Sequence, residues 1–89
     1  MQTRKECFRC GTTLGLHRHH CFGGGNRQIS EHDGCWIWLC GRHHNLSNEG
    51  IHFNRTFDLE VKMATELAWM KQNNKTIEDF IKRYGRNYV

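Results

Sequence analysis

The sequence predicts a small α+β domain stabilised by zinc, in which two strands are followed by helices. Two residue pairs, Cys7-x-x-Cys10 and Cys40-x-x-His43, have the spacing with which two half-sites complete a tetrahedral zinc shell. The segment between the pairs contains two strand-like runs, and apolar residues beyond it recur with the period of a helix. Because a chain of this size buries only a modest core, a metal cross-link is physically useful.

The composition is that of one folded domain. Of the 89 residues, 37% are hydrophobic and 25% are charged, which favours a packed core over disorder. We expect a single domain over residues 1–89, with a core at 5–54 and a helical tail at 55–89. Residues 1–5 lead into polar sequence without an apolar signal region, and no run approaches the ~20 apolar residues of a membrane helix. We therefore predict a cytoplasmic protein with no membrane partner.

The first predicted strand covers residues 13–21, where the residues alternate in the way expected of a strand with two different faces. One set is Leu14, Leu16, His17, His19 and Cys21, and the other is Gly15, Arg18 and His20. A period of two sends His19 and His20 to opposite faces of this strand. Three consecutive glycines follow at 23–25, and glycine loses the most backbone entropy on folding. We expect a surface loop over residues 22–34.

The second predicted strand, residues 35–40, is rich in aromatic and β-branched side chains and should pair with the first as a hairpin. We expect Trp36 and Trp38 to point to different sides, one into the core and the other toward the loop. A short helix is expected at 41–46, interrupted near Gly50.

The clearest helical pattern runs over residues 58–71, where Trp69 is expected to be a core residue. Its predicted apolar stripe consists of Phe57, Val61, Ala64, Leu67 and Ala68. A last helix is predicted from the N-cap Thr76, with Asp79 three positions on, to a stop at Gly85.

The five cysteines are better explained by metal than by disulfides, because their number is odd and a reducing compartment disfavours pairing. We assign to a structural zinc the residues Cys7, Cys10, Cys40 and His43. Cys21 and Cys35 remain, and we interpret both as buried thiols. The alternative is that Cys35 replaces His43 as the fourth ligand.

The net charge of +4 favours a polyanionic partner such as DNA. Binding would come mainly from sequence-independent neutralisation of phosphates. Arg27 and Arg42 flank the proposed histidine site. The full set of candidate contacts is Arg18, Arg27, Arg42, Arg55, Lys62, Lys82, Arg83 and Arg86. We interpret two other charged or polar candidates, His17 and His32, as surface residues.

The order of motifs resembles a known family. A Cys-x-x-Cys knuckle precedes a strand ending in His19-His20, and a second strand runs into Cys40-x-x-His43-His44. This arrangement resembles the HNH endonucleases of the His-Me finger (ββα-metal) superfamily, over residues 7–54. The glycines after His20 and the segment Ser47-Asn48-Glu49-Gly50-Ile51-His52-Phe53-Asn54 are similar to small HNH proteins of phages and prophages.

The resemblance implies a ββα-metal core with a C-terminal helical extension, and a phage-encoded DNA endonuclease in the cytoplasm of a bacterial host. It also implies a recombination or packaging protein of phage or host as a candidate partner. By the same resemblance, His19 would bind the catalytic metal and His20 would be the general base. His44 would complete the metal site, assisted by Asn48 or by His52.

One position departs from the family pattern. HNH proteins place an asparagine at the start of the second strand, where this chain has Cys35. That asparagine braces the loop that carries the base. Cys35, Asp33 and Asn26 are the alternatives for this work in the present chain.

These residues suit phosphodiester hydrolysis, because an imidazole can accept the proton of an attacking water at neutral pH. A divalent ion on His19 and His44 would act as a Lewis acid. All-imidazole ligation suits Zn²⁺, Ni²⁺ or Mn²⁺, and an Asn48 oxygen would favour Mg²⁺. The resemblance implies Mg²⁺ or Mn²⁺ for turnover. The rival function is a non-catalytic zinc-finger module that binds DNA.

Overall fold

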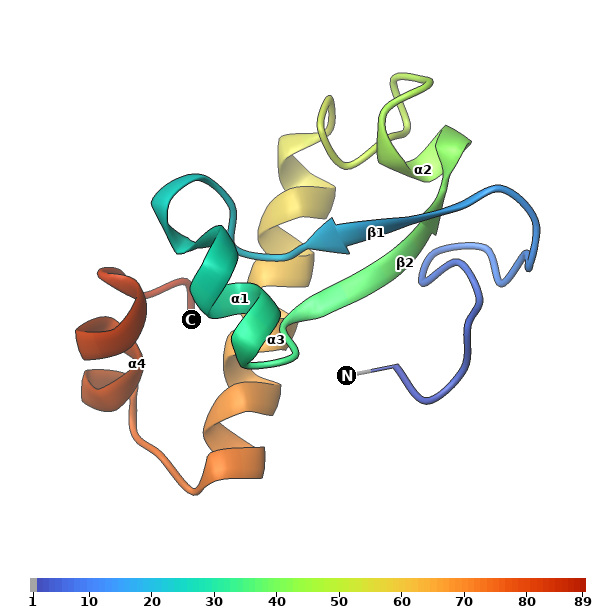
Figure 1. The fold of residues 1–89 in the computed structure, drawn as a ribbon. Coiled ribbons are helices and arrows are strands. Elements are labelled where there is room, and N and C mark those ends of the chain that lie inside the picture. The colour runs from blue at the N-terminus through green and yellow to red at the C-terminus, as the bar shows by residue number, and fades with distance from the viewer. Residues whose placement is uncertain (1) are drawn as a thin grey trace.

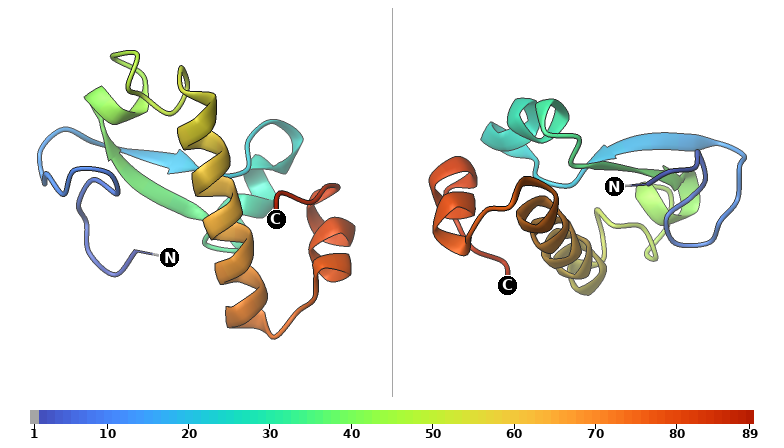
Figure 2. Two further views of the ribbon diagram at one scale, coloured as in Figure 1. Left: turned by 180° about the vertical axis from the view of Figure 1, so that it is seen from behind. Right: turned by 90° about the horizontal axis from the view of Figure 1, so that it is seen from below.

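Two antiparallel strands, β1 (Leu16–His20) and β2 (Trp36–Cys40), form the centre of the fold in a computed structural model, which describes residues 2–89 and not Met1. The remaining elements are the short 3-10 turn η1 (Gly24–Asn26), α1 (Arg27–His32), α2 (Gly41–His44), α3 (Arg55–Asn73) and α4 (Ile77–Tyr84). Helix α3 crosses behind the hairpin, with α2 at one end of the strands and α1 and α4 toward the other (Figures 1 and 2). The predicted α+β class and the predicted hairpin are confirmed.

The hairpin has an inner face and an outer face. Its register pairs His19 with Ile37, and both side chains are buried on the inner face. The prediction that Trp36 and Trp38 lie on different sides is wrong, because residues two apart in a strand share a face. Their rings meet edge to face, with centroids 5.2 Å apart, and both are half-buried beside Arg18 on the outer face.

The surface loop predicted over residues 22–34 is wrong in part, since η1 and α1 occupy residues 24–32. Glycine disfavours regular structure only at residues 23–25. The next six residues contain neither glycine nor proline, so nothing in them opposes a helix. Ser30 fixes this helix to the hairpin. It is fully buried, its hydroxyl donates to the carbonyl of Cys35, and its own carbonyl accepts from the Cys35 amide at 2.8 Å.

Helix α3 begins three residues before the predicted pattern. The Asn54 side chain accepts a hydrogen bond from the Phe57 amide at 3.0 Å and so caps the helix N terminus. This cap satisfies a backbone donor that the helix cannot use itself. Phe57 is thereby held inside the first turn, where it is buried against the core.

The buried stripe of α3 differs from the apolar stripe predicted. Leu67 is 49% exposed, whereas Thr65 and Glu66 are fully buried. Both polar side chains have hydrogen-bond partners, which lowers the cost of burying them. The Thr65 hydroxyl donates to the carbonyl of Val61 at 2.6 Å, and Glu66 accepts from the Tyr88 amide at 2.7 Å. Glu66 therefore fastens the C-terminal residues to α3.

Helix α4 has the predicted ends. Thr76 and Asp79 form a reciprocal capping box, and Gly85 adopts the left-handed conformation, with φ of 87°, that ends the helix. Phe80 and Tyr84 stack with ring centroids 4.7 Å apart and are buried against the Trp69 side of α3. None of the helices within residues 2–89 has the length and apolarity to span a bilayer.

Asp33 joins the end of α1 to both C-terminal helices. Its carboxylate accepts from Arg83 at 2.6 and 2.7 Å, from the Tyr84 hydroxyl at 2.7 Å and from the Trp69 indole at 3.1 Å. Burial opposes its ionisation, but the bonds from Arg83, Tyr84 and His32 outweigh that effect and lower the pKa of Asp33 to about 2. The ionised carboxylate is therefore part of the folded structure.

Replacing Asp33 by alanine should lower the free energy of unfolding by about 2 to 4 kcal/mol, because three donors lose a largely buried ionised acceptor. Since the folded pKa of Asp33 is depressed, its contribution is complete above about pH 4 and is lost as the pH falls toward 2. Urea unfolding measures this effect: the difference in the free energy of unfolding between Asp33→Ala and the natural protein should become smaller as the pH falls from about 4 toward 2. Glu78→Ala, on the exposed side of α4, is the control and should unfold like the natural protein.

Candidate functional site

Four soft ligands meet where the N-terminal segment touches the end of β2. Their ligand atoms, from Cys7, Cys10, Cys40 and His43, all lie within 4.8 Å of one another. The Sγ atoms of Cys10 and Cys40 are 3.8 Å apart. A tetrahedral zinc ion with bonds of about 2.3 Å to sulfur separates its sulfur ligands by about 3.8 Å. This cluster can therefore hold zinc, with the His43 ring facing it through Nδ1.

Local backbone geometry aims these ligands. The Cys7 amide donates to Thr12 and its carbonyl accepts from Gly11, each at 2.8 Å, and Gly11 has a φ of 78° that suits glycine in this turn. Burial opposes ionisation of Cys7, but backbone donors at Cys40, Cys10 and Arg9 lower its pKa to about 6. A thiolate is the form of cysteine that binds metal.

The other two cysteines are separate from this cluster. Cys21 and Cys35 are buried, as predicted, and burial raises the pKa of both thiols, that of Cys21 to about 12. The Cys35 sulfur lies 3.6 Å from the Tyr84 hydroxyl oxygen, at the opposite end of β2 from Cys40. His43, rather than Cys35, is thus the fourth member of the zinc cluster.

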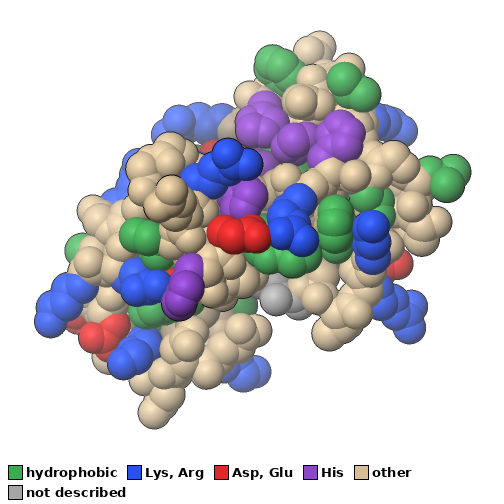
Figure 3. Space-filling model, viewed as in Figure 1, with side chains coloured by type: hydrophobic (Ala, Val, Ile, Leu, Met, Phe, Trp, Pro, Cys, Tyr) green, Lys and Arg blue, Asp and Glu red, His purple; other side chains and the backbone are tan. Residues whose placement is uncertain are grey.

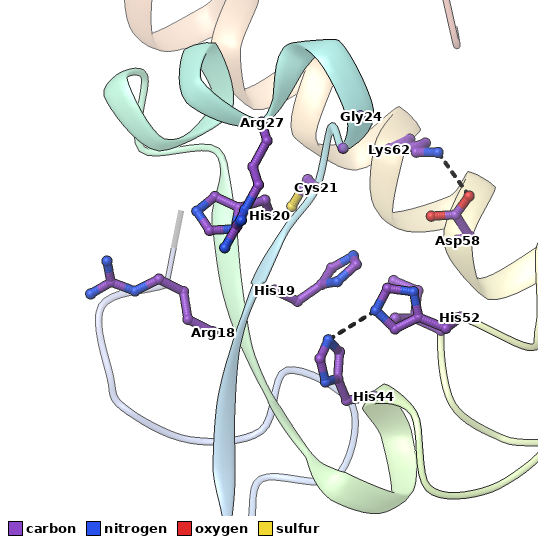
Figure 4. Close-up of a pocket in the computed structure, with 12 residues that line it drawn as sticks. Arg18, His19, His20, Cys21, Gly24, Arg27, His44, His52, Asp58 and Lys62 are labelled. Carbon is purple, nitrogen blue, oxygen red and sulfur yellow. Dashed lines mark hydrogen bonds and ion pairs between the residues drawn. The ribbon is translucent and has the colours of Figure 1, made fainter.

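Three imidazoles form a second cluster on the inner face of the hairpin, near the end of β1. His19, His44 and His52 come from β1, from α2 and from the turn before α3, and their rings point toward one another in Figure 4. The ring centroids are 4.6 to 5.4 Å apart. Nε2 of His44 lies 3.0 Å from Nε2 of His52. The three nitrogens can therefore face one ion.

Burial and mutual repulsion keep the rings of His19 and His44 neutral. Burial first, and then the neighbouring His52 and His44, lower the pKa of His19 to about 3. Burial together with His52 and His17 lowers the pKa of His44 to about 4. Nε2 of His19 is buried and is one of two such side-chain atoms in residues 2–89 without a hydrogen-bond partner. A buried lone pair without a donor fits a metal ligand.

His17 was predicted to be a surface residue, and this prediction is wrong. Its ring is half-buried, and its Nδ1 lies 2.9 Å from Nδ1 of His44. If Nε2 of His44 faces an ion, the proton of its ring is on Nδ1 and is donated to His17. His17 shares the inner face of β1 with His19, two residues away, and that period was the available signal. His32, in contrast, is exposed as predicted.

A close turn brings His52 back to α2. The amide of His52 donates to the carbonyl of His44 at 3.2 Å. Gly50 makes this approach feasible, since a Cβ there would lie 2.6 Å from the same carbonyl oxygen. Asn48, the other candidate for assisting the metal, is exposed and is not among the residues that line the adjoining cavity.

A cavity of about 540 Å³ adjoins the three imidazoles and extends past the end of β1 to the outer face. Its lining includes His19, His20, Arg27, His44, His52 and Lys62. In Figure 3 the imidazoles gather at the surface with Lys and Arg side chains beside them. The cavity is therefore cationic, although Lys62 is paired with Asp58 at 2.9 Å (Figure 4). Sequence analysis did not single out that pair, for which the i,i+4 spacing was the signal.

The predicted base and the predicted DNA contacts are only partly brought together. His20 lies across β1 from the His19 cluster, as expected, with Arg27 beside it. Arg18 also lines the cavity, but its guanidinium pairs with Glu31 at 2.7 Å. Arg42 is outside the lining and pairs with Glu49 near the zinc cluster.

None of the three alternatives for bracing the base contacts His20. Asp33 is engaged with α3 and α4, and the Asn26 amide donates to the Tyr84 carbonyl at 2.8 Å. The Cys35 thiol faces the same tyrosine. All three contact Tyr84 of α4.

Comparisons of this chain with models of known protein families, with curated proteins and with solved structures found no match.

Changing Cys7 to serine should remove the zinc and unfold the domain, because structural zinc sites in small domains contribute about 10 kcal/mol or more. Elemental analysis should give about one zinc per chain for the natural protein and none for Cys7→Ser. Cys21→Ala, which removes a buried thiol outside the cluster, should keep its zinc. A cooperative thermal melt that survives chelation of the metal would contradict this role.

Changing His52 to alanine should weaken binding of Mn²⁺ or Ni²⁺ by about 10- to 100-fold, since one of three imidazole ligands is lost. Asn48→Ala is the matched control in the same turn and should bind these ions normally. Titration calorimetry on zinc-loaded protein measures both affinities. Equal losses in the two variants would place Asn48 among the ligands.

Proposed function

We propose that this protein is a metal-dependent DNA endonuclease of the HNH type, with His20 as general base and one divalent ion on His19, His44 and His52. The observation that carries this proposal is the single cavity that all four imidazoles line. His19 and His20 are consecutive in β1, so their side chains point to opposite faces of the strand. A metal ligand and a base can therefore occupy adjacent positions in the chain without competing for the same ion.

The same proposal includes the assignment of this fold to the ββα-metal type. Strands β1 and β2 with helix α2 would be the ββα-metal unit, with the three-imidazole cluster at its centre. The zinc cluster would hold the knuckle of residues 7–10 to the junction of β2 and α2, and α3 and α4 would be the helical extension. Antiparallel pairing and the position of α2 directly after Cys40 support this assignment.

The chain supplies the groups that hydrolysis of a phosphodiester requires. His20 would take a proton from a water whose oxygen bonds to phosphorus while the bond to the 3′ oxygen breaks. A bound divalent ion would polarise a phosphate oxygen and stabilise the departing oxygen. Arg27 and Lys62 would neutralise the backbone phosphates that enter the cavity. The His20 proton would then pass to solvent.

The spacing of the ligands favours a six-coordinate ion. Two bonds of about 2.1 Å at a right angle separate their ligand atoms by about 3.0 Å. The two Nε2 atoms of His44 and His52 are 3.0 Å apart. Mn²⁺ or Ni²⁺ would suit this all-imidazole edge better than a four-coordinate zinc, whereas Mg²⁺ prefers oxygen ligands.

Changing His20 to alanine should lower metal-dependent nicking of plasmid DNA at least ~100-fold, because the proton acceptor is lost. Zinc content and DNA affinity should change little. His32→Ala is the matched control, since that ring is exposed and outside the three-imidazole cluster. If the natural protein binds DNA but never cuts it with Mg²⁺, Mn²⁺, Ni²⁺ or Co²⁺, the zinc-finger binding module is the better description.

A further inference from the structure

We propose that Glu31 of α1 is the positioning residue for His20, holding its ring in the tautomer that leaves Nδ1 free to accept a proton. This role rests on the proposed function. Oε2 of Glu31 lies 2.6 Å from Nε2 of His20, the closest polar contact of either ring nitrogen. The contact joins the end of β1 to α1, a segment that was predicted to be a surface loop.

The contacts of the two ring nitrogens are compatible with one neutral tautomer. A carboxylate only accepts, so Nε2 of His20 carries the hydrogen that is donated to Glu31. Nε of Arg27 is a donor and lies 3.4 Å from Nδ1, which therefore presents its lone pair. The basic nitrogen thus faces the cavity side on which Arg27 lies. A phosphate that drew Arg27 away would leave Nδ1 to a water molecule.

Glu31 is itself held from the other side. Its second oxygen, Oε1, accepts from Nη1 of Arg18 at 2.7 Å. The Arg18 guanidinium in turn lies 4.1 Å over the ring of Trp36, on the outer face of the hairpin. The hydrogen bond from His20, followed by the charge of Arg18, lowers the pKa of Glu31. At neutral pH the group is an ionised acceptor with both oxygens occupied.

The backbone that carries Glu31 is also fixed. Ser30, the preceding residue, is fully buried, and its carbonyl accepts from Cys35 at 2.8 Å. Helix α1 is therefore anchored to the hairpin one residue before Glu31. The side chain itself is 45% exposed. An exposed ion pair contributes little to stability, so Glu31 variants should fold.

This arrangement names a residue for the work that the family asparagine does in HNH proteins. Glu31 is the carboxylate that contacts the ring of His20, whereas Cys35, Asp33 and Asn26 contact the C-terminal helices. A carboxylate that orients an imidazole through one nitrogen leaves the other as the proton acceptor, as in serine hydrolase triads.

The first experiment measures the tautomer directly and requires no activity. Protein with ¹⁵N-labelled histidine is examined by long-range ¹H–¹⁵N correlation at about pH 8, above the ordinary imidazole pKa. The His20 signals are identified by their absence in His20→Ala. In the natural protein Nε2 should be protonated and Nδ1 bare, and in Glu31→Ala the two tautomers should mix. An unchanged His20 spectrum in Glu31→Ala would overturn the proposal.

The second experiment separates positioning from DNA binding. Glu31→Ala should lower kcat for plasmid nicking about 10- to 100-fold with KM within about 3-fold, because orientation and not substrate affinity is lost. Glu31→Gln, whose amide oxygen can still accept from Nε2, should restore part of kcat. Glu60→Ala, the control, removes a more exposed carboxylate paired with Arg9 at 3.8 Å and should cut normally.

The results distinguish the two proposals. A natural protein that cuts DNA while Glu31→Ala keeps full kcat would overturn the role of Glu31 and leave the nuclease function intact. A natural protein that never cuts would overturn the nuclease function, and the tautomer measurement would still decide whether Glu31 holds the ring of His20.

Discussion

Residues 40–44, at the junction of β2 and α2, supply ligands to both candidate metal centres. The backbone of this junction therefore determines how the two clusters lie relative to each other. Cys40 and His43 face the cysteine-rich cluster, whereas His44 faces the three-imidazole cluster. Successive residues in a helical turn point about 100° apart, so a zinc ion that held His43 would also fix the direction of His44. The turn through Gly50 then adds His52 by a backbone bond to the same residue. A metal ion in the cysteine-rich cluster would therefore fix the positions of the residues that form the second cluster.

The parts of this arrangement that depend on local spacing could be predicted from the sequence. Cys7 with Cys10 and Cys40 with His43 are such pairs, and so are the capping box at Thr76 and the opposite faces of His19 and His20. Each follows from a period of two, three or four residues. These are distances over which backbone geometry alone fixes the relation between side chains.

The parts that depend on contacts between distant segments could not be predicted in this way. His17 meets His44 across 27 positions, and Asp33 meets Arg83 across 50. Thr65 and Glu66 are polar and were not predicted to be buried, because their partners, the Val61 carbonyl and the Tyr88 amide, are not visible in the local pattern. The prediction for Trp36 and Trp38 was wrong for another reason. A period of two places residues two apart on the same face of a strand, and the prediction placed them on opposite faces.

The C-terminal helices act on the site through α1. This helix has only six residues, and isolated helices of such length are not stable in water. It is held at Ser30 by Cys35, the residue before β2, and at Asp33 by α3 and α4, and Glu31 lies between these two anchors. Loss of the Asp33 bonds would free the end of α1 and so loosen the carboxylate that contacts His20. The helical tail is therefore a support for the ring of His20 as well as a cover for the core.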